Sequence, residues 1–122
     1  MGPERKLWHE LKRNTPQMRW TRIENTSLLG TPDLLGYNTS GRFFTVELKV
    51  TKSNKIKFSP HQIAFHITHP KNSYILVKSL DQSDLKLFPG TKIQQLVACG
   101  FRLEACSLGL KSVIETLEAC GL

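Results

Sequence analysis

Cysteine is scarce in this sequence, and long apolar runs are missing. The three cysteines, Cys99, Cys106 and Cys120, are odd in number and lack the paired spacing of metal sites. We therefore expect free thiols in a reducing compartment rather than a disulfide framework. No apolar stretch approaches the roughly 20 residues that a membrane-spanning helix needs. The charged segment 1–14 does not resemble a signal peptide. These absences predict a cytoplasmic protein without a membrane partner.

Acidic residues are also few. Ten Asp and Glu stand against 17 Lys and Arg, so the formal net charge is +7 over 122 residues. A small basic domain is typical of proteins that bind polyanions, and nucleic acid is the first candidate. Hydrophobic residues make up 39% of the chain, enough for one modest core, and we expect a single domain over residues 1–122. The sequence has no glycine-rich nucleotide-binding loop and no nucleophile elbow.

What the sequence does contain is a stretch, residues 32–50, that predicts a β-hairpin. Turn residues near its centre separate two segments rich in strand formers. In such a hairpin Asp33 lies opposite Glu47 or its neighbour Val46. Because side chains alternate along a strand, Glu47 shares one face with Lys49. The other face is apolar and is expected in the core; it carries Phe44, Val46, Leu48 and Val50.

Two neighbouring carboxylates repel each other. At about 4 Å and an effective dielectric constant of about 20, the cost is roughly 4 kcal/mol. A divalent cation removes this cost, and hard oxygen ligands suit Mg²⁺ or Mn²⁺. The alternative is an ordinary solvated hairpin in which Asp33 pairs with Lys49 across the strands.

Hydrophobic spacing and turn residues predict the remaining elements. Helices are expected over 2–14, 59–69, 91–99 and 110–119, strands over 18–26, 73–80 and 85–88, and an extended segment over 101–106. The strand over 73–80 is apolar enough to be central. The helix before it favours a right-handed crossover from the hairpin. Ile67 and Val97 are expected on the buried sides of their helices.

Two further groups of residues lie near the hairpin in the sequence. Ser59 is expected to cap the second helix, which puts Gln62 in the first turn, near the point where Lys49 leaves the sheet. The basic segment 51–57 can follow a phosphate backbone. The alternatives are a surface glutamine and a solvated turn. Zinc is not expected, because the histidines His61, His66 and His69 have no further soft ligand nearby.

The ordered set of helix, strand, Pro-Asp strand, Glu-x-Lys strand, helix and strand resembles the PD-(D/E)XK nuclease superfamily. The matching motifs are Pro32-Asp33 and, after 13 intervening residues, Glu47-Leu48-Lys49. The flanks Gly-Thr-Pro-Asp-Leu at 30–34 and Phe-Ser-Pro-His-Gln at 58–62 resemble the virus-type replication-repair nuclease (VRR-NUC) branch, which is related to Holliday-junction resolvases.

This resemblance covers about residues 4–80 and leaves a C-terminal helical extension, about residues 90–122, without a motif. It implies an α/β fold. A mixed central sheet of about four to five strands would be flanked by helices, in the core order α-β-β-β-α-β.

The resemblance also implies a Mg²⁺- or Mn²⁺-dependent endodeoxyribonuclease. Asp33 and Glu47 would hold the metal, helped by the backbone carbonyl of Leu48. Lys49 would orient or activate the attacking water and stabilise the developing negative charge. Gln62 would position a phosphate or the water.

An acid from the first helix would complete the site. Glu4 suits this role best, either as a ligand or through a water, with Glu10 and Glu24 as rivals. The DNA itself would be bound mainly through its phosphates. The residues expected to contact it are Arg22, Lys52, Lys55, Lys57 and Ser59.

A structure-selective enzyme of DNA recombination and repair is the leading hypothesis, acting on branched DNA such as a Holliday junction. Two symmetric cuts favour a homodimer, with the last helix or the strand over 73–80 at the interface, and a phage origin fits the family. One alternative is a sequence-specific endonuclease of homing or restriction type. The other is a non-catalytic DNA-binding module with the same fold.

Overall fold

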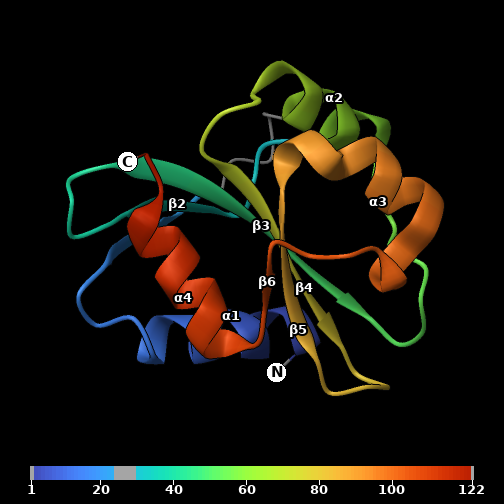
Figure 1. Cartoon of the computed structure of the whole chain (residues 1–122), viewed down its shortest axis with the longest axis horizontal. Coiled ribbons are helices and arrows are strands. Elements are labelled where there is room, and N and C mark those ends of the chain that lie inside the picture. The colour runs from blue at the N-terminus through green and yellow to red at the C-terminus, as the bar shows by residue number, and fades with distance from the viewer. Residues whose placement is uncertain (1, 24–29, 122) are drawn as a thin grey trace.

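The computed structural model describes residues 2–23 and 30–121. Figure 1 shows a central sheet with helices on both sides. The elements follow in the order α1 (Pro3–Arg13), β1 (Arg19–Arg22), β2 (Leu34–Tyr37), β3 (Phe43–Thr51), α2 (Pro60–Thr68), β4 (Ser73–Ser79), β5 (Leu85–Pro89), η1 (Gly90–Lys92), α3 (Ile93–Cys99), η2 (Gly100–Arg102), β6 (Ser107–Leu108) and α4 (Leu110–Ala119). Through β4, this is the order expected from the sequence. None of the described helices is long and apolar enough to cross a bilayer.

Within the described ranges, six strands form one sheet in the order β1 to β6. The β3–β4 pair is parallel and the other pairs are antiparallel, so the sheet is mixed and the fold is α/β. The expected count of four to five strands was too low. Residues 101–106 were expected to be extended but were not counted as a strand. In the structure this segment begins with the short η2 helix, and the next two residues, Ser107–Leu108, form the sixth strand by pairing with β5. A two-residue edge strand has no sequence periodicity to reveal it.

β4 is one of the two central strands of the sheet, as its apolar sequence predicted. It pairs with β3 on one side and with β5 on the other. Both of its edges are therefore hydrogen-bonded, and the expectation that residues 73–80 might form a dimer interface was wrong. A strand that is paired on both sides has no free backbone groups to offer a second copy.

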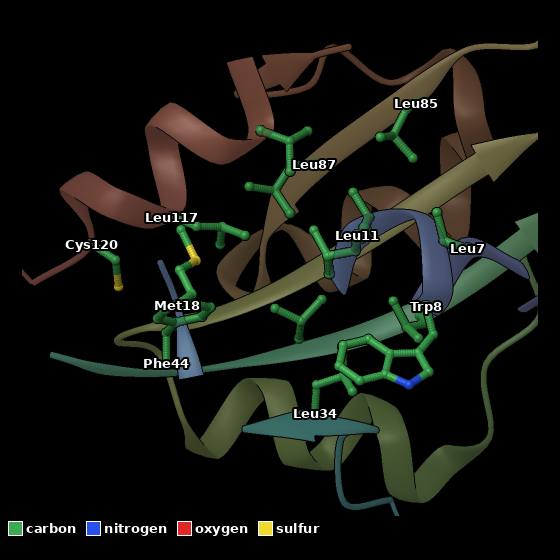
Figure 2. Packing of buried hydrophobic residues seen from close by; sticks show 14 residues of the cluster. Leu7, Trp8, Leu11, Met18, Leu34, Phe44, Leu85, Leu87, Leu117 and Cys120 are labelled. Atoms are coloured by element: carbon green, nitrogen blue, oxygen red, sulfur yellow. The ribbon is translucent and has the colours of Figure 1, made fainter. Parts of the chain in front are cut away.

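The larger apolar cluster lies under α1 and α4 (Figure 2). It contains the predicted core face of β3, with Phe44, Val46 and Leu48 buried and Val50 partly buried against them. The two helices contribute the side chains of Leu7, Trp8, Leu11, Val113 and Leu117. Burial of each large side chain is worth roughly 1.5–3 kcal/mol. Because α4 belongs to the extension that carries no motif, the extension contributes directly to this core.

A second apolar cluster fills the opposite side of the sheet, where α2 and α3 lie (Figure 1). Its buried residues come mainly from β4, β5 and α3: Ile56, Ile75, Val77, Phe88, Ile93, Leu96 and Phe101. Two expected core residues are absent, since Ile67 is 52% exposed and Val97 is 45% exposed. In α2 the buried residue is His66, one position before Ile67, and the Ile67 side chain is exposed. In α3 the buried pair Ile93 and Leu96 turns Val97 outward.

Candidate active site

The hairpin brings Asp33 next to Glu47, as its sequence predicted. The β2–β3 ladder ends where Leu34 pairs with Val46. The backbone N–H of Leu48 lies beyond this last pair, and it donates to Asp33 Oδ2 at 2.7 Å. Asp33 therefore continues the ladder with its side chain, and this contact holds its carboxylate at the end of the strand beside Glu47.

Glu47 is buried, with only 2% of its surface exposed. Its Oε1 atom is fully buried and has no hydrogen-bond partner. Burial raises the pKa of Glu47 to about 9, helped by the charge of the neighbouring Asp33 carboxylate and by a hydrogen bond between the two side chains. A buried, unpaired carboxylate oxygen is costly. The repulsion expected from the sequence therefore appears in the fold as this raised pKa, and Glu47 keeps its proton near pH 7 unless a cation replaces it.

This donor set fits a hard divalent cation. Two acidic side chains, one with a free buried oxygen, lie next to each other where the Leu48 N–H holds Asp33 at the end of the hairpin ladder. Oxygen ligands of this kind suit Mg²⁺ and Mn²⁺. Among the described residues, no three His, Cys, Asp or Glu side chains are grouped closely enough to hold one ion. Asp33 and Glu47 are therefore the two side chains that fit as ligands, and Glu4 does not join them as a third in this arrangement.

Gln62 connects Glu47 to Lys49. Lys49 Nζ donates to Gln62 Oε1 at 3.0 Å, and Gln62 Nε2 donates to Glu47 Oε2 at 3.3 Å. The structure thus places Gln62 where the sequence predicted it. The alternative Asp33–Lys49 ion pair is not among the contacts of these described residues. Lys49 also lies over the ring of Phe58, 4.8 Å from its centroid.

The position of Gln62 follows from the local sequence of α2. Ser59 Oγ accepts from the Gln62 backbone N–H at 3.1 Å, and Gln62 Oε1 accepts from the Ser59 N–H at 3.0 Å. This is a capping box, which satisfies free donors at the start of a helix. The same amide oxygen receives Lys49, so the helix cap also orients the lysine. Phe58 was missed as a site residue; an aromatic next to the cap was the available signal.

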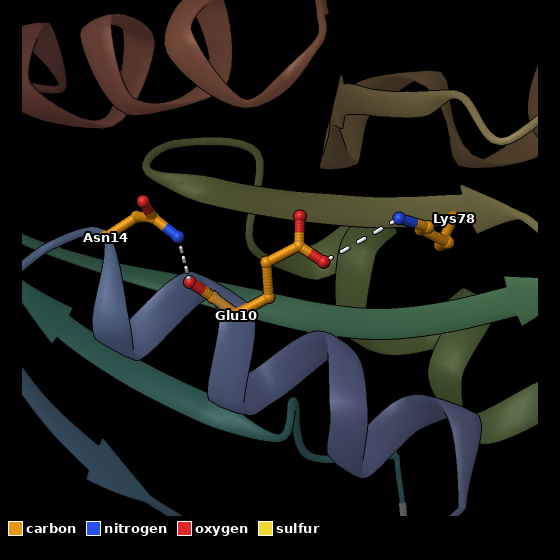
Figure 3. Close-up of polar contacts among 3 residues, drawn as sticks. All are labelled: Glu10, Asn14 and Lys78. Carbon is orange, nitrogen blue, oxygen red and sulfur yellow. Dashed lines mark hydrogen bonds and ion pairs between the residues drawn. The ribbon is translucent and has the colours of Figure 1, made fainter.

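Of the two described acids considered for completing the site, Glu4 and Glu10, Glu4 is the one that faces it. Partial burial and the nearby Asp33 carboxylate raise the pKa of Glu4, while Lys49 opposes the shift. Glu4 lines a cavity of about 500 Å³ together with Lys49 and a smaller one of about 210 Å³ with Asp33. Glu10 is engaged elsewhere, 3.6 Å from Lys78 (Figure 3). Glu24 lies outside the described residues.

The expected DNA-contacting residues surround the same site. Lys52, Lys55 and Lys57 line the 500 Å³ cavity with Glu4 and Lys49. Arg22 lines the smaller cavity, and Ser59 is exposed at the start of α2. The structure thus gathers the predicted residues around the end of β3.

The histidines of α2 form no metal cluster within the described ranges. His66 is fully buried, its Nδ1 lies 3.1 Å from Ser73 Oγ, and burial lowers its pKa to about 4. The ring is therefore neutral near pH 7. His69 instead stacks on Phe65, with 3.9 Å between ring centroids.

No protein-family model matches this sequence, and no curated protein matches it. The resemblance to nucleases therefore remains a prediction.

Proposed function

We propose that this protein is a metal-dependent endonuclease that hydrolyses phosphodiester bonds in DNA. The observation that carries the proposal is the buried Glu47 carboxylate, which has an unpartnered Oε1 and lies beside Asp33. Lys49 is linked to the same carboxylate through Gln62. A purely structural hairpin has no need to bury an unsatisfied carboxylate beside a second acid, whereas a cation site does.

Asp33 and Glu47 would hold Mg²⁺ or Mn²⁺, with the Leu48 carbonyl as a further ligand. When bound, the ion would supply a more acidic water and offset negative charge on the phosphate. Asp33 is held for this role by the Leu48 N–H. Glu47 is held by the amide of Gln62.

Lys49 would act on the reacting phosphate or on the attacking water. Its ammonium group is anchored by Gln62 Oε1 and lies over the Phe58 ring, so little of its side chain is left to be ordered during the reaction. A fixed positive charge there would stabilise the negative charge that develops on the phosphate oxygens. Glu4, at the edge of the cavity, would orient a water in the outer part of the site.

The preferred substrate in this proposal is branched DNA, cut by a homodimer. The described part of the chain folds around one sheet and adds no sequence-reading module to it. This favours recognition of DNA shape and backbone over recognition of bases.

The test is to incubate the protein with Mg²⁺ and a panel of linear duplex, nicked, flap and four-way-junction DNAs. We expect paired symmetric nicks in the four-way junction and no cleavage in EDTA. Cleavage at one sequence of the linear duplex would instead identify a sequence-specific endonuclease. Binding to DNA without cleavage in Mg²⁺ or Mn²⁺ would identify a non-catalytic module.

A further inference from the structure

The basic loop at the mouth of the site, residues 51–57, packs against the C-terminal extension through Ile56 and is hydrogen-bonded to it through Asn54. The side-chain Nδ2 of Asn54 donates to Cys99 O at 2.8 Å, and its Oδ1 accepts from the Arg102 N–H at 2.8 Å. Its backbone O accepts from the Phe101 N–H at 2.7 Å. Three hydrogen bonds thus join the loop to the turn between α3 and η2, which is more than 40 residues away in the sequence.

The segment that contacts Asn54, Cys99 to Arg102, lets the two backbones lie close together at Gly100. Gly100 has φ +75, and a Cβ at this position would lie 2.4 Å from Asn54 O. A side chain there would both strain the backbone and push the loop away. The turn is also fixed from β5, because Lys86 Nζ donates to Phe101 O at 2.6 Å. Asn54 therefore connects the loop to a fixed support.

The attached loop carries a strong positive charge. The cavity that it borders is lined by four lysines and one acid, Glu4. No Asp or Glu occurs anywhere from 48 to 80 in the sequence. The support adds a further cation, because Arg102 is exposed and its own N–H is one of the three contacts with Asn54.

We propose that Asn54 is a positioning residue, and that residues 52–57 and Arg102 form one preordered surface for DNA phosphates next to the cleaved one. This inference rests on the proposed function, because it names the surface that binds the same substrate. A loop that is ordered before binding loses less conformational entropy when it meets a phosphate backbone. The C-terminal extension thereby gains a role in substrate binding.

The matched control is Asn38, at the opposite end of β3. Its Nδ2 donates to Leu117 O at 3.0 Å, to Glu118 O at 3.3 Å and to Cys120 O at 3.2 Å. Asn38 therefore also ties a loop to the C-terminal extension, but far from the cavity. Asn38 is buried whereas Asn54 is exposed, so Asn38→Ala is expected to cost more stability than Asn54→Ala.

The experiment measures binding of a fluorescently labelled four-way junction in EDTA, where cleavage plays no part, together with the melting temperature of each variant. We expect Asn54→Ala to raise Kd by about three- to tenfold, the usual cost of ordering one or two extra side chains on binding. Gly100→Ala is expected to raise Kd by a similar factor, because the new methyl group would push Asn54 away. Asn38→Ala is expected to lower the melting temperature more and to leave Kd unchanged.

Arg102→Ala removes one cation but keeps the backbone N–H that donates to Asn54. We expect it to reduce the slope of log Kd against log salt by about one unit, as the loss of one phosphate contact does. In the double variant with Asn54→Ala, the effect of Arg102→Ala on Kd is expected to shrink, because the residues act through one surface.

Equal Kd for wild type and for both Asn54→Ala and Arg102→Ala would overturn the inference, even if the protein proves to be a nuclease. A parallel weakening by Asn38→Ala would also overturn it, since general stability would then explain the loss. If the wild type binds the junction and never cleaves it, the proposed catalysis fails while these binding differences still decide the inference. A wild type that binds no DNA overturns both.

Discussion

The two faces of β3 differ sharply although they belong to one nine-residue strand. One face places Phe44, Val46 and Leu48 in the apolar cluster under α1 and α4. The other places Glu47 and Lys49 beneath the start of α2, in contact with Gln62. Because alternate side chains point to opposite faces, one strand can anchor the core and present charged groups only one residue apart. Substitutions at neighbouring positions of β3 should therefore affect either stability or the candidate chemistry.

The polar face of β3 also has the less complete hydrogen bonding. The apolar face leaves no polar side chain to be paired, whereas Glu47 Oε1 is buried without a partner. An arrangement of this kind lowers stability and is retained where a site needs it. Substitutions on each face and at the neighbouring helices test whether the two faces have these separate roles.

The largest effect is expected on the apolar face. Phe44→Ala removes a ring that is 1% exposed and should lower the free energy of unfolding by about 3–5 kcal/mol, measured by urea denaturation. The matched control is its neighbour Phe43, which is 56% exposed and pairs with Tyr37 at 4.6 Å. Phe43→Ala should cost about 1 kcal/mol or less. Similar losses for both variants would contradict the assignment of the two faces.

The next largest effect concerns cleavage and belongs to the polar face. Asp33→Ala, Glu47→Ala and Lys49→Ala should each lower the cleavage rate by at least about 10²-fold, the range seen when one transition-state contact is removed. Binding of the junction should remain largely intact, because most of the phosphate contacts are assigned to other residues around the site, such as Lys52, Lys55 and Lys57. Cleavage at the wild-type rate by any one of the three would remove that residue from the site.

The first-helix acids supply the control for this series. Glu4→Ala should reduce cleavage clearly, because Glu4 is electrostatically coupled to Asp33 and Lys49. Glu10→Ala should leave cleavage unchanged, because Glu10 pairs with Lys78. The reverse result would reassign the acid.

A smaller effect is expected on the pH dependence of stability. The pKa of Glu47 is raised from 4.5 to about 9, so the folded protein keeps a proton that the unfolded chain releases. The stability associated with this group is complete below about pH 4.5 and is lost as the pH rises towards 9. In EDTA the melting temperature of the wild type should therefore fall relative to that of Glu47→Gln over this window.

Added Mg²⁺ extends the same measurement. Above pH 8, where the ion competes effectively with protons, it should raise the melting temperature of the wild type and not that of Glu47→Gln. Parallel curves for the two proteins, with and without the metal, would argue against a cation site at Glu47.

The smallest effect is expected at the helix cap. Ser59→Ala removes the acceptor for the Gln62 N–H and should cost about 1 kcal/mol of stability. Because the capping box also holds the amide that binds Lys49, cleavage should fall modestly as well. Thr68→Ala, at the other end of α2, is the control: its hydroxyl contacts Ala64 O, far from the site. Its stability loss should come without a loss of cleavage.

Much of the candidate site was predictable because its geometry is local. The register of the hairpin depends on its turn, and the alternation of side chains then puts Asp33 beside Glu47. The position of Gln62 depends on a cap four residues long. In each case the determining interactions lie within about 15 residues, where turn and cap preferences are strong.

Other features depended on contacts between distant segments. Which residues of α2 are buried, His66 but not Ile67, is decided by what that helix packs against. The sixth strand exists because Ser107 meets Leu87, and neither residue has a pattern that foretells the pairing. In the sequence Asn54 is an ordinary turn residue, and only the fold brings it to its partners Cys99 and Arg102.

The sequence by itself determined the α/β class, the hairpin with its paired acids, the helix cap and the net positive charge. Hydrophobic alternation, turn residues and helix caps act between residues close in the chain, so they can be recognised in the sequence. Only the tertiary structure decided that Glu47 is buried with a free oxygen, that Glu4 rather than Glu10 faces it, and that the C-terminal extension supports the basic loop. Burial and long-range contact arise only when the whole chain has packed, because they depend on every segment at once.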